Sequence, residues 1–155
     1  EIGWCDWSSD VCSSDLDLRA AGRLERLPRI LAVQPAHCDP LARAFEAGLD
    51  EPVRIEKKET AAEGIASAEP VRGAEVLRAV RETGGGFVAV SEAEIWSAHS
   101  ALCRAGLYVE PTSAAAAAGW DKLCESGRID AAEPTVVYLS GIGLKATDKI
   151  AGHVH

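Results

Sequence analysis

Short apolar runs along the chain predict its extended segments. RILAVQ (29–34) and FVAV (87–90) are compact and apolar, which is typical of buried strands. TVVYLS (135–140) predicts a last strand, and LYVEP (107–111) predicts an extended segment between two helical patterns. A further short strand is predicted at Val53–Ile55, inside a stretch that is otherwise rich in charge, proline and glycine.

Longer stretches with helical spacing separate these segments. Apolar residues recur three and four positions apart in four ranges, 39–48, 73–86, 91–106 and 112–127. Ser91 followed by Glu94 is a capping-box pattern, and Thr112 or Ser113 is the expected N-cap of the last helix. Because strands alternate with helices of about 10–15 residues, the sequence predicts βαβ units, a parallel sheet and an α/β fold class.

Ligands of such sheets bind beyond the carboxyl ends of the strands, beside helix N-termini. This rule draws attention to the residues that follow Gln34, Val109 and Leu139. After Val109, the stretch EPTSAAAAAG (110–119) brings Glu110 to the start of a helix, whose free backbone amides favour an anion or another acceptor. A well-capped helix that packs closely on a sheet, without any ligand, explains the same residues.

The segment YLSGIGLK (138–145) follows the predicted last strand. The strand ends in Ser140, and Gly141 and Gly143 permit a tight turn with close approach of the backbone to a ligand. In the functional interpretation, the Ser140 hydroxyl hydrogen-bonds a heteroaromatic nitrogen at the carboxyl end of the strand. In the alternative interpretation, both glycines serve the turn alone.

Composition narrows the class of protein. The formal net charge is −8 and the isoelectric point is about 5.0, and no stripe of lysine and arginine is present, which argues against a nucleic-acid partner. The apolar runs are far shorter than the roughly 20 residues of a membrane span, so no membrane partner is expected. Cys38, Cys103 and Cys124 are odd in number and widely spaced, which predicts reduced thiols in a soluble cytoplasmic protein.

Residues 1–16, EIGWCDWSSDVCSSDL, show neither helical nor strand periodicity. They also lack the basic region and the apolar run of about 7–15 residues of a signal peptide. The codons of DWSSDVCSSDL (6–16) can spell a common short-read library adapter. We therefore expect residues 1–16 to be a non-native tail joined to a truncated gene; a disordered native tail is the alternative.

Several motifs together resemble one enzyme family. GLYVEPTSAAAAAG, followed some twenty residues later by VVYLSGIGLK, resembles the carboxyl-terminal part of threonine synthase and its fold-type-II pyridoxal-phosphate relatives. ETAAEGIASAEPVRG (59–73), PRILAVQP and VAVSEAEI also resemble family segments, in the family's order. The resemblance covers roughly residues 23–148 and implies a three-layer αβα, parallel-sheet fold like that of the tryptophan synthase β chain. It also implies pyridoxal 5'-phosphate as cofactor and a small amino acid as substrate.

The resemblance assigns roles to three residues, and the glycine turn supplies Gly141 as a fourth predicted cofactor-binding residue. Ser140 matches the hydroxyl residue that hydrogen-bonds the pyridine nitrogen of the cofactor, although threonine is frequent there in threonine synthases. Glu110 matches a carboxylate near the ring, and Gly64 matches a loop whose backbone approaches the cofactor edge. Gly141 belongs to the turn that permits close approach to the cofactor.

The family's Schiff-base lysine and Gly-rich phosphate loop have no counterpart here, so no catalytic residue is assigned. Lys145 is interpreted as structural, and TGGGF (83–87) as a helix stop, because it precedes a strand. Residues 17–155 are therefore predicted to be the C-terminal part of a catalytic domain that is inactive alone and exposes sheet edges. The full-length protein, with a homodimer as one expected arrangement, would convert O-phosphohomoserine and water to threonine and phosphate.

Three alternatives to this function remain open at this point. The first is a serine/threonine dehydratase-type lyase, because serine at position 140 is common in that group. The second is a non-catalytic α/β ligand-binding module. The third is a metal site at His99 and Cys103, which lie four residues apart on one helix face; with no third ligand at a suitable spacing, a buried core position is the better interpretation.

Overall fold

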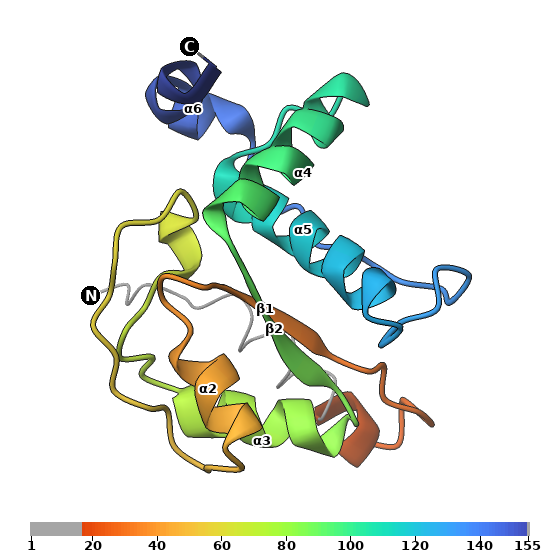
Figure 1. The fold of residues 1–155 in the computed structure, drawn as a ribbon. Coiled ribbons are helices and arrows are strands. Elements are labelled where there is room, and N and C mark those ends of the chain that lie inside the picture. The colour runs from red at the N-terminus through yellow and green to blue at the C-terminus, as the bar shows by residue number, and fades with distance from the viewer. Residues whose placement is uncertain (1–16, 155) are drawn as a thin grey trace. The chain divides into compact units, whose positions relative to one another are not determined.

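The computed structural model describes residues 17–154, and the expected tail (1–16) lies outside the described residues. Figure 1 shows the order of the elements. Residues 17–20 are helical, and the elements that follow in chain order are β1 (Leu31–Pro35), α2 (Pro40–Glu46), the 3-10 helix η1 (Glu63–Ile65), α3 (Gly73–Glu82), β2 (Gly86–Val90), α4 (Glu92–Arg104), α5 (Pro111–Glu125), the 3-10 helix η2 (Gly143–Ala146) and α6 (Thr147–Val154).

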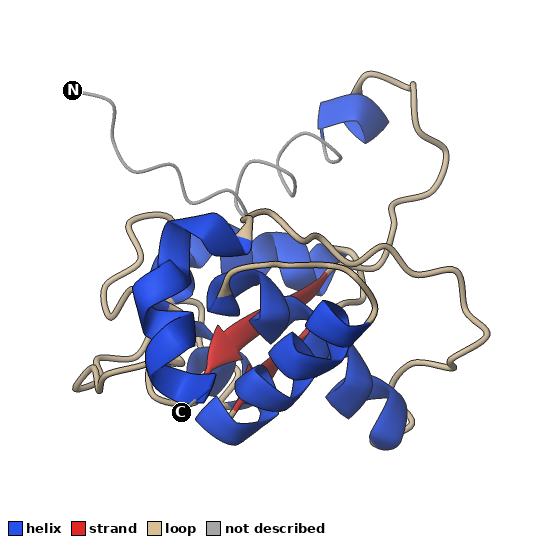
Figure 2. Cartoon of the chain, turned by 90° about the horizontal axis from the view of Figure 1, so that it is seen from above, coloured by secondary structure: helices blue, strands red, loops and turns tan. Residues whose placement is uncertain are grey.

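β1 and β2 are hydrogen-bonded neighbours in one sheet, drawn in red in Figure 2. At one end the Gly86 amide donates to the Ile30 carbonyl (3.1 Å), and at the other the Ala36 amide donates to the Val90 carbonyl (2.7 Å). Residue numbers increase along both strands from the first of these bonds to the second, so the pair is parallel. α2 and α3 lie between the two strands along the chain. The predicted βαβ arrangement is confirmed.

The chain divides into two compact units. The first comprises the residues up to Ala32, Pro40–Glu56 and Ser67–Phe87. The second comprises Val33–Asp39, Lys57–Ala66 and the residues from Val88 onward. Each unit has its own apolar core.

The first unit is built on the packing of α2 against α3, which lie side by side in Figure 1. Its core consists of the apolar faces of these helices together with the start of β2: Leu41, Ala42, Ala44, Val76, Leu77, Val80 and Phe87. Phe45 contacts Phe87 with ring centroids 5.2 Å apart.

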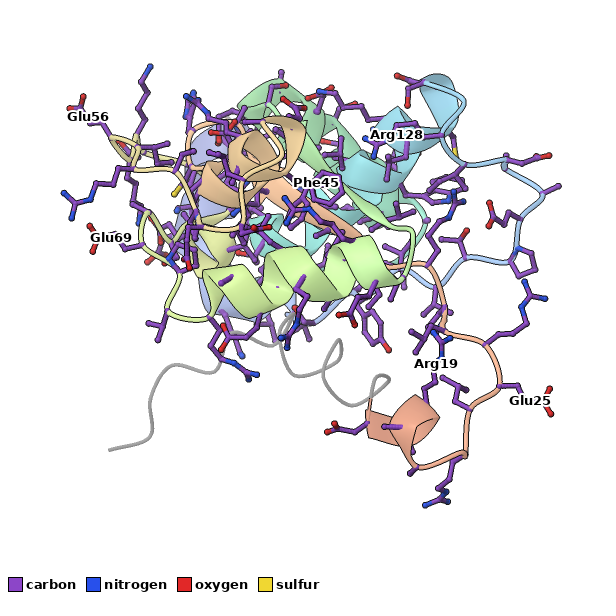
Figure 3. All side chains as sticks on the ribbon, turned by 90° about the horizontal axis from the view of Figure 1, so that it is seen from below. Arg19, Glu25, Phe45, Glu56, Glu69 and Arg128 are labelled. Carbon is purple, nitrogen blue, oxygen red and sulfur yellow. The ribbon has the colours of Figure 1, made fainter. Side chains whose placement is uncertain are left out.

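Glu56 and Glu69 lie on the connecting loops and point outward (Figure 3). The charge-rich residues therefore lie on the surface, and Val53–Ile55 forms no strand, which makes that prediction wrong.

The second unit is built on α4 and α5, which pack along each other. Its core is rich in alanine, with Ala62, Val90, Ile95, Ala98, Val109, Ala114, Ala115 and Ala118 buried. A Cβ atom on Gly119 would lie 2.4 Å from Val33 Cγ2, so α5 contacts β1 at a distance that only glycine permits at this position. The expected close packing of the alanine-rich helix on the sheet is confirmed.

The start of α4 has the predicted capping box. The Ser91 amide donates to Glu94 Oε2 (2.6 Å), and the Glu94 amide donates to Ser91 Oγ (3.3 Å). Lys122 of α5 lies 2.9 Å from Glu94 Oε1 and also donates to the Ala89 carbonyl (2.9 Å). Burial opposes ionisation of Glu94, but hydrogen bonds from Ser91 and Lys122 outweigh it and hold the pKa of this carboxyl below its usual value.

The start of α5 differs from the prediction. Its N-cap is Glu110, with Pro111 as the first helical residue and no hydrogen bond from the capping side chain. Thr112 and Ser113 therefore lie inside the first turn instead of at the cap. The predicted end is confirmed, because Gly127 follows the helix with φ +69°.

The predicted last strand is wrong, because residues 135–140 form no strand. In this part of the chain, the only pairing is an isolated antiparallel bridge between Val109 and Ile142. From residue 136 to 144, exposed positions alternate with less exposed ones, as in a strand. The outward apolar side chains are Val136 (79% exposed), Tyr138 (66%), Ile142 (53%) and Leu144 (69%). The segment has the side-chain pattern of a strand but no neighbouring strand with which to pair.

The carboxyl-terminal helix α6 did not follow from the sequence pattern. Ile150 is its buried residue, and the His153 ring stacks on Trp96 of α4 with centroids 3.9 Å apart.

No helix among residues 17–154 is both long and apolar enough to cross a membrane. Cys38, Cys103 and Cys124 are free thiols, and burial raises the pKa of Cys38.

Candidate functional site

The second unit contains a cavity of about 530 Å³ beside the start of α5. Three segments bound it, namely the loop around η1, the first residues of α5 and the stretch from η2 into α6. The lining residues are Ala61, Glu63, Gly64, Glu110, Pro111, Thr112, Leu144, Lys145, Ala146, Thr147, Asp148 and Lys149. Two of the predicted site residues, Gly64 and Glu110, are thus brought to one cavity from segments about 46 residues apart in the sequence.

Gly141 lies directly against Glu110. The Glu110 amide donates to the Gly141 carbonyl (3.0 Å), and a Cβ atom on Gly141 would lie 1.9 Å from Glu110 Oε1. Only glycine leaves room for the carboxylate in this position. Gly141 is therefore a point of close approach, but the group that approaches it here is the Glu110 side chain, and the expected approach to a ligand stays a prediction.

Ser113 connects the first turn of α5 to the same glycine. Its hydroxyl accepts a hydrogen bond from the Gly141 amide (2.8 Å) and donates to the Gly141 carbonyl (3.2 Å). The Ser113 side chain is 1% exposed, so these bonds are shielded from water. The sequence pattern suggested Ser113 only as a helix cap, and its real partner, 28 residues away, is visible only in the fold.

Replacing Ser113 with alanine is expected to lower the free energy of unfolding by about 1–3 kcal/mol, because the buried Gly141 amide loses its partner. Urea unfolding followed by circular dichroism measures this change. Ser126→Ala is the matched control at the other end of α5, where the exposed hydroxyl donates to Leu123 O (3.1 Å) and its loss should cost no more than about 0.5 kcal/mol. Equal costs for the two variants would contradict the assigned role of Ser113.

The loop around η1 contacts the start of α5 and α6. The Gly64 amide donates to Thr112 Oγ1 (3.3 Å), and Glu63 Oε1 pairs with Lys149 Nζ at 2.6 Å. The hydrogen bond from Lys149 holds the pKa of the Glu63 carboxyl below its usual value. The cavity is therefore bordered by both carboxylates and ammonium groups, with Lys145 the second cation. This mixture suits a ligand that carries charges of both signs.

Ser140 is exposed and does not line this cavity, although it directly precedes Gly141. The structure thus brings together Gly64, Glu110 and Gly141 and leaves Ser140 beside them on the outward face of residues 136–144.

His99 is 4% exposed and lies in the core, as expected, with burial lowering its pKa. Among residues 17–154, no group of three or more His, Cys, Asp or Glu side chains is arranged to hold a metal ion.

Comparisons with known proteins agree with one another. The family model described as "Pyridoxal-phosphate dependent enzyme" matches residues 17–141. Threonine synthase from Methanocaldococcus jannaschii is 34% identical over 133 residues, which cover 85% of this chain and 33% of that protein. Threonine synthase from Mycobacterium leprae is 35% identical over 133 residues, which cover 85% of this chain and 35% of that protein. The chain thus spans about a third of the length of the curated relatives it matches.

Two solved structures share the fold. A threonine deaminase from T.th. has a TM-score of 0.57 at 27% identity, covering 78% of this chain and 40% of that one. Maize serine racemase has a TM-score of 0.59 at 20% identity, covering 92% of this chain and 43% of that one, and at that identity shows the fold alone. The α/β fold predicted from the sequence is therefore confirmed both by the parallel strand pair and by the structural neighbours.

Proposed function

Because the chain belongs to the family of pyridoxal-phosphate dependent enzymes, we propose that it is the C-terminal part of a threonine-synthase-type lyase. The full-length protein would convert O-phosphohomoserine and water to threonine and phosphate. The observation that carries this proposal is the similarity to threonine synthases of 34–35% identity over 85% of the chain. We further propose that the full-length protein acts in the cytoplasm, as a homodimer, on a small amino-acid substrate.

The residues around the cavity fit the cofactor of this family. Gly64 and Glu110 line the cavity, and the ammonium groups of Lys145 and Lys149 beside it could contact the phosphate of the cofactor or a substrate carboxylate. When bound, pyridoxal phosphate withdraws electrons from the substrate and so supports elimination and replacement at its side-chain carbons. In this proposal the Ser140 hydroxyl hydrogen-bonds the pyridine nitrogen, which would then lie at the exposed face beside the cavity, because Ser140 does not line the cavity itself. Unlike an aspartate, a hydroxyl does not force that nitrogen to carry a proton.

The lysine that holds the cofactor and the phosphate-binding loop are proposed to lie upstream of this chain. Lys149 forms an ion pair with Glu63, and Lys145 lies in η2, directly after the glycine turn, where we propose a structural role. The 155-residue chain is accordingly proposed to be inactive alone. The exposed apolar row formed by Val136, Tyr138, Ile142 and Leu144 supports this proposal, because four large apolar side chains on one side of the segment form a surface that further structure would cover.

A dehydratase-type lyase is the second candidate. It is favoured by the structural likeness to the T.th. threonine deaminase, at 27% identity. Both candidates use the same cofactor, so the cofactor does not separate them. Their products differ, because a synthase releases phosphate from O-phosphohomoserine whereas a dehydratase releases ammonia from threonine or serine.

The test begins with the gene in its source DNA. Reading the bases upstream of Asp17 is expected to show an open frame with a lysine motif and a Gly-rich loop. The full-length protein, loaded with pyridoxal phosphate, is then expected to release phosphate from O-phosphohomoserine and little ammonia from threonine, while the 155-residue chain releases neither. If the full-length protein releases ammonia but no phosphate, the dehydratase activity is supported and the synthase activity is rejected. If the open reading frame in the source DNA encodes residues 1–16 and begins with them, the proposal that this chain is a fragment is overturned.

A further inference from the structure

Glu92, in the first turn of α4, binds a loop that lies about 30 residues earlier in the chain. Its Oε1 accepts a hydrogen bond from Thr60 Oγ1 (2.5 Å), and its Oε2 accepts one from the Ala61 amide (2.7 Å). Thr60 is 3% exposed, and its hydroxyl also accepts a hydrogen bond from the Ala62 amide (3.2 Å). Hydrogen bonds to a carboxylate are roughly twice as strong as those between neutral groups. Glu92 therefore holds both the side chain and the backbone of this loop.

The same loop is held from the other strand. His37 follows β1, and its Nδ1 lies 2.5 Å from the Glu59 carbonyl oxygen and 3.7 Å from Glu92 Oε1. Its own carbonyl accepts a hydrogen bond from the Lys58 amide (3.1 Å). The residues that follow the carboxyl ends of β1 and β2 thus meet at residues 58–61, which is the edge of a parallel sheet where ligand sites form.

The held loop leads directly into the cavity. η1 begins at Glu63, two residues after Ala61, and supplies Glu63 and Gly64 to the cavity wall. Gly64 then contacts α5 through a single hydrogen bond to Thr112 Oγ1 (3.3 Å). Because Gly64 is exposed and this bond is long, the position of Gly64 depends on the residues before it, where Glu92 holds Thr60 and Ala61, Ala62 is buried in the core, and Glu63 pairs with Lys149.

We propose that Glu92 is a positioning residue for the cofactor site. By holding Thr60 and Ala61, it helps to fix where the backbone of Gly64 borders the cavity that Glu110 also lines. This inference rests on the proposed function in one respect, the approach of Gly64 to the cofactor edge. The contacts that carry it lie within the second unit and do not depend on the substrate.

The first arm of the test measures amide hydrogen exchange in the 155-residue chain. Glu92→Gln keeps the shape of the side chain but removes its charge and one acceptor oxygen. Exchange at the amides of residues 61–64 is expected to become roughly tenfold to a hundredfold faster, the factor that matches the loss of a hydrogen bond to a charged group. Glu94→Gln is the matched control, because Glu94 lies in the same turn of α4 but contacts Ser91 and Lys122. It should leave residues 61–64 unchanged.

Thr60 tests the same contact from the loop, should Glu92→Gln fail to fold. Thr60→Val removes the hydroxyl at nearly constant volume and is expected to accelerate exchange as Glu92→Gln does. Thr60→Ser retains the hydroxyl and should keep the exchange rates of the unsubstituted chain. Unchanged exchange at residues 61–64 in Thr60→Val, or equal acceleration in Glu94→Gln, would overturn the positioning role.

The second arm measures affinity for pyridoxal phosphate in the full-length protein, by titration followed through tryptophan fluorescence. Glu92→Gln and Thr60→Val are expected to raise the Kd about tenfold, while Glu94→Gln and Thr60→Ser leave it unchanged. Faster amide exchange at residues 61–64 together with an unchanged Kd for pyridoxal phosphate would overturn the inference. Phosphate release is not measured in either arm. If the proposed substrate is wrong, both measurements therefore still support or reject the role of Glu92.

Discussion

A Gly141→Ala variant of the full-length protein is expected to lose about a hundredfold in kcat/KM, the loss typical of a group displaced by about 1 Å from its productive position. The added Cβ atom would lie 1.9 Å from Glu110 Oε1 and 2.2 Å from its carboxyl carbon, so the Glu110 side chain must move. In the 155-residue chain, the same change should cost about 1–3 kcal/mol in the free energy of unfolding, as overpacking of a buried site does. Steady-state kinetics and urea unfolding measure the two effects.

The control for this prediction is Gly152→Ala in α6, where an added Cβ atom meets nothing within 4 Å. It should be neutral, or stabilising by up to about 1 kcal/mol, because alanine favours the helix over glycine. A combined Gly141→Ala and Glu110→Ala variant separates the two consequences. It should recover stability by removing the clash but not activity, since the carboxylate is absent. Unchanged kinetics in Gly141→Ala would show that the position of Glu110 does not matter to the reaction.

A Gly85→Ala variant is expected to destabilise the chain by about 3 kcal/mol, the upper end of the usual range for overpacking. The added Cβ atom would lie 1.8 Å from the carbonyl oxygen of Ile30 and 2.8 Å from its carbonyl carbon. These are backbone atoms and cannot turn aside as a side chain can. The Ile30 carbonyl also accepts the hydrogen bond from the Gly86 amide that opens the pairing of β1 with β2. Thermal and urea unfolding should both report the loss.

Gly48→Ala provides the comparison for Gly85→Ala. Gly48 has φ +70°, but an added Cβ atom would meet nothing within 4 Å. Its replacement should therefore cost only the backbone strain of about 1–2 kcal/mol for a left-handed residue. If Gly85→Ala were no more harmful than Gly48→Ala, the close approach of Gly85 to Ile30 would not exist in solution.

The local elements of the fold followed from the sequence because their signals are local. The capping box at Ser91 and Glu94, the glycine stop at Gly127 and the apolar runs of β1 and β2 each depend on residues a few positions apart. Propensity and capping act over that range, so these elements were predicted. The family was indicated by the sequence as well, because several of its motifs occur in the family's order.

The segment 135–140 shows where this reasoning ends. Its alternating apolar residues predicted a strand, but a strand requires a hydrogen-bonded partner, and residues 135–140 have no strand beside them in the part of the chain that the structure describes. Thr112 and Ser113 show the same limit. Their residue types fit a helix cap, yet Ser113 binds Gly141 and Thr112 accepts from Gly64.

The sequence by itself determined the βαβ order and the family, and it pointed to Gly64, Glu110 and Gly141 as candidate site residues. The tertiary structure decided which of them meet. It placed Gly64 and Glu110 on one cavity, left Ser140 outside it, and revealed that Glu92 holds the loop that carries Gly64. These contacts join segments roughly 30 to 50 residues apart, and no local propensity encodes a hydrogen bond over such a separation. Only the packing of α4, α5 and the strand ends brings their partners within reach.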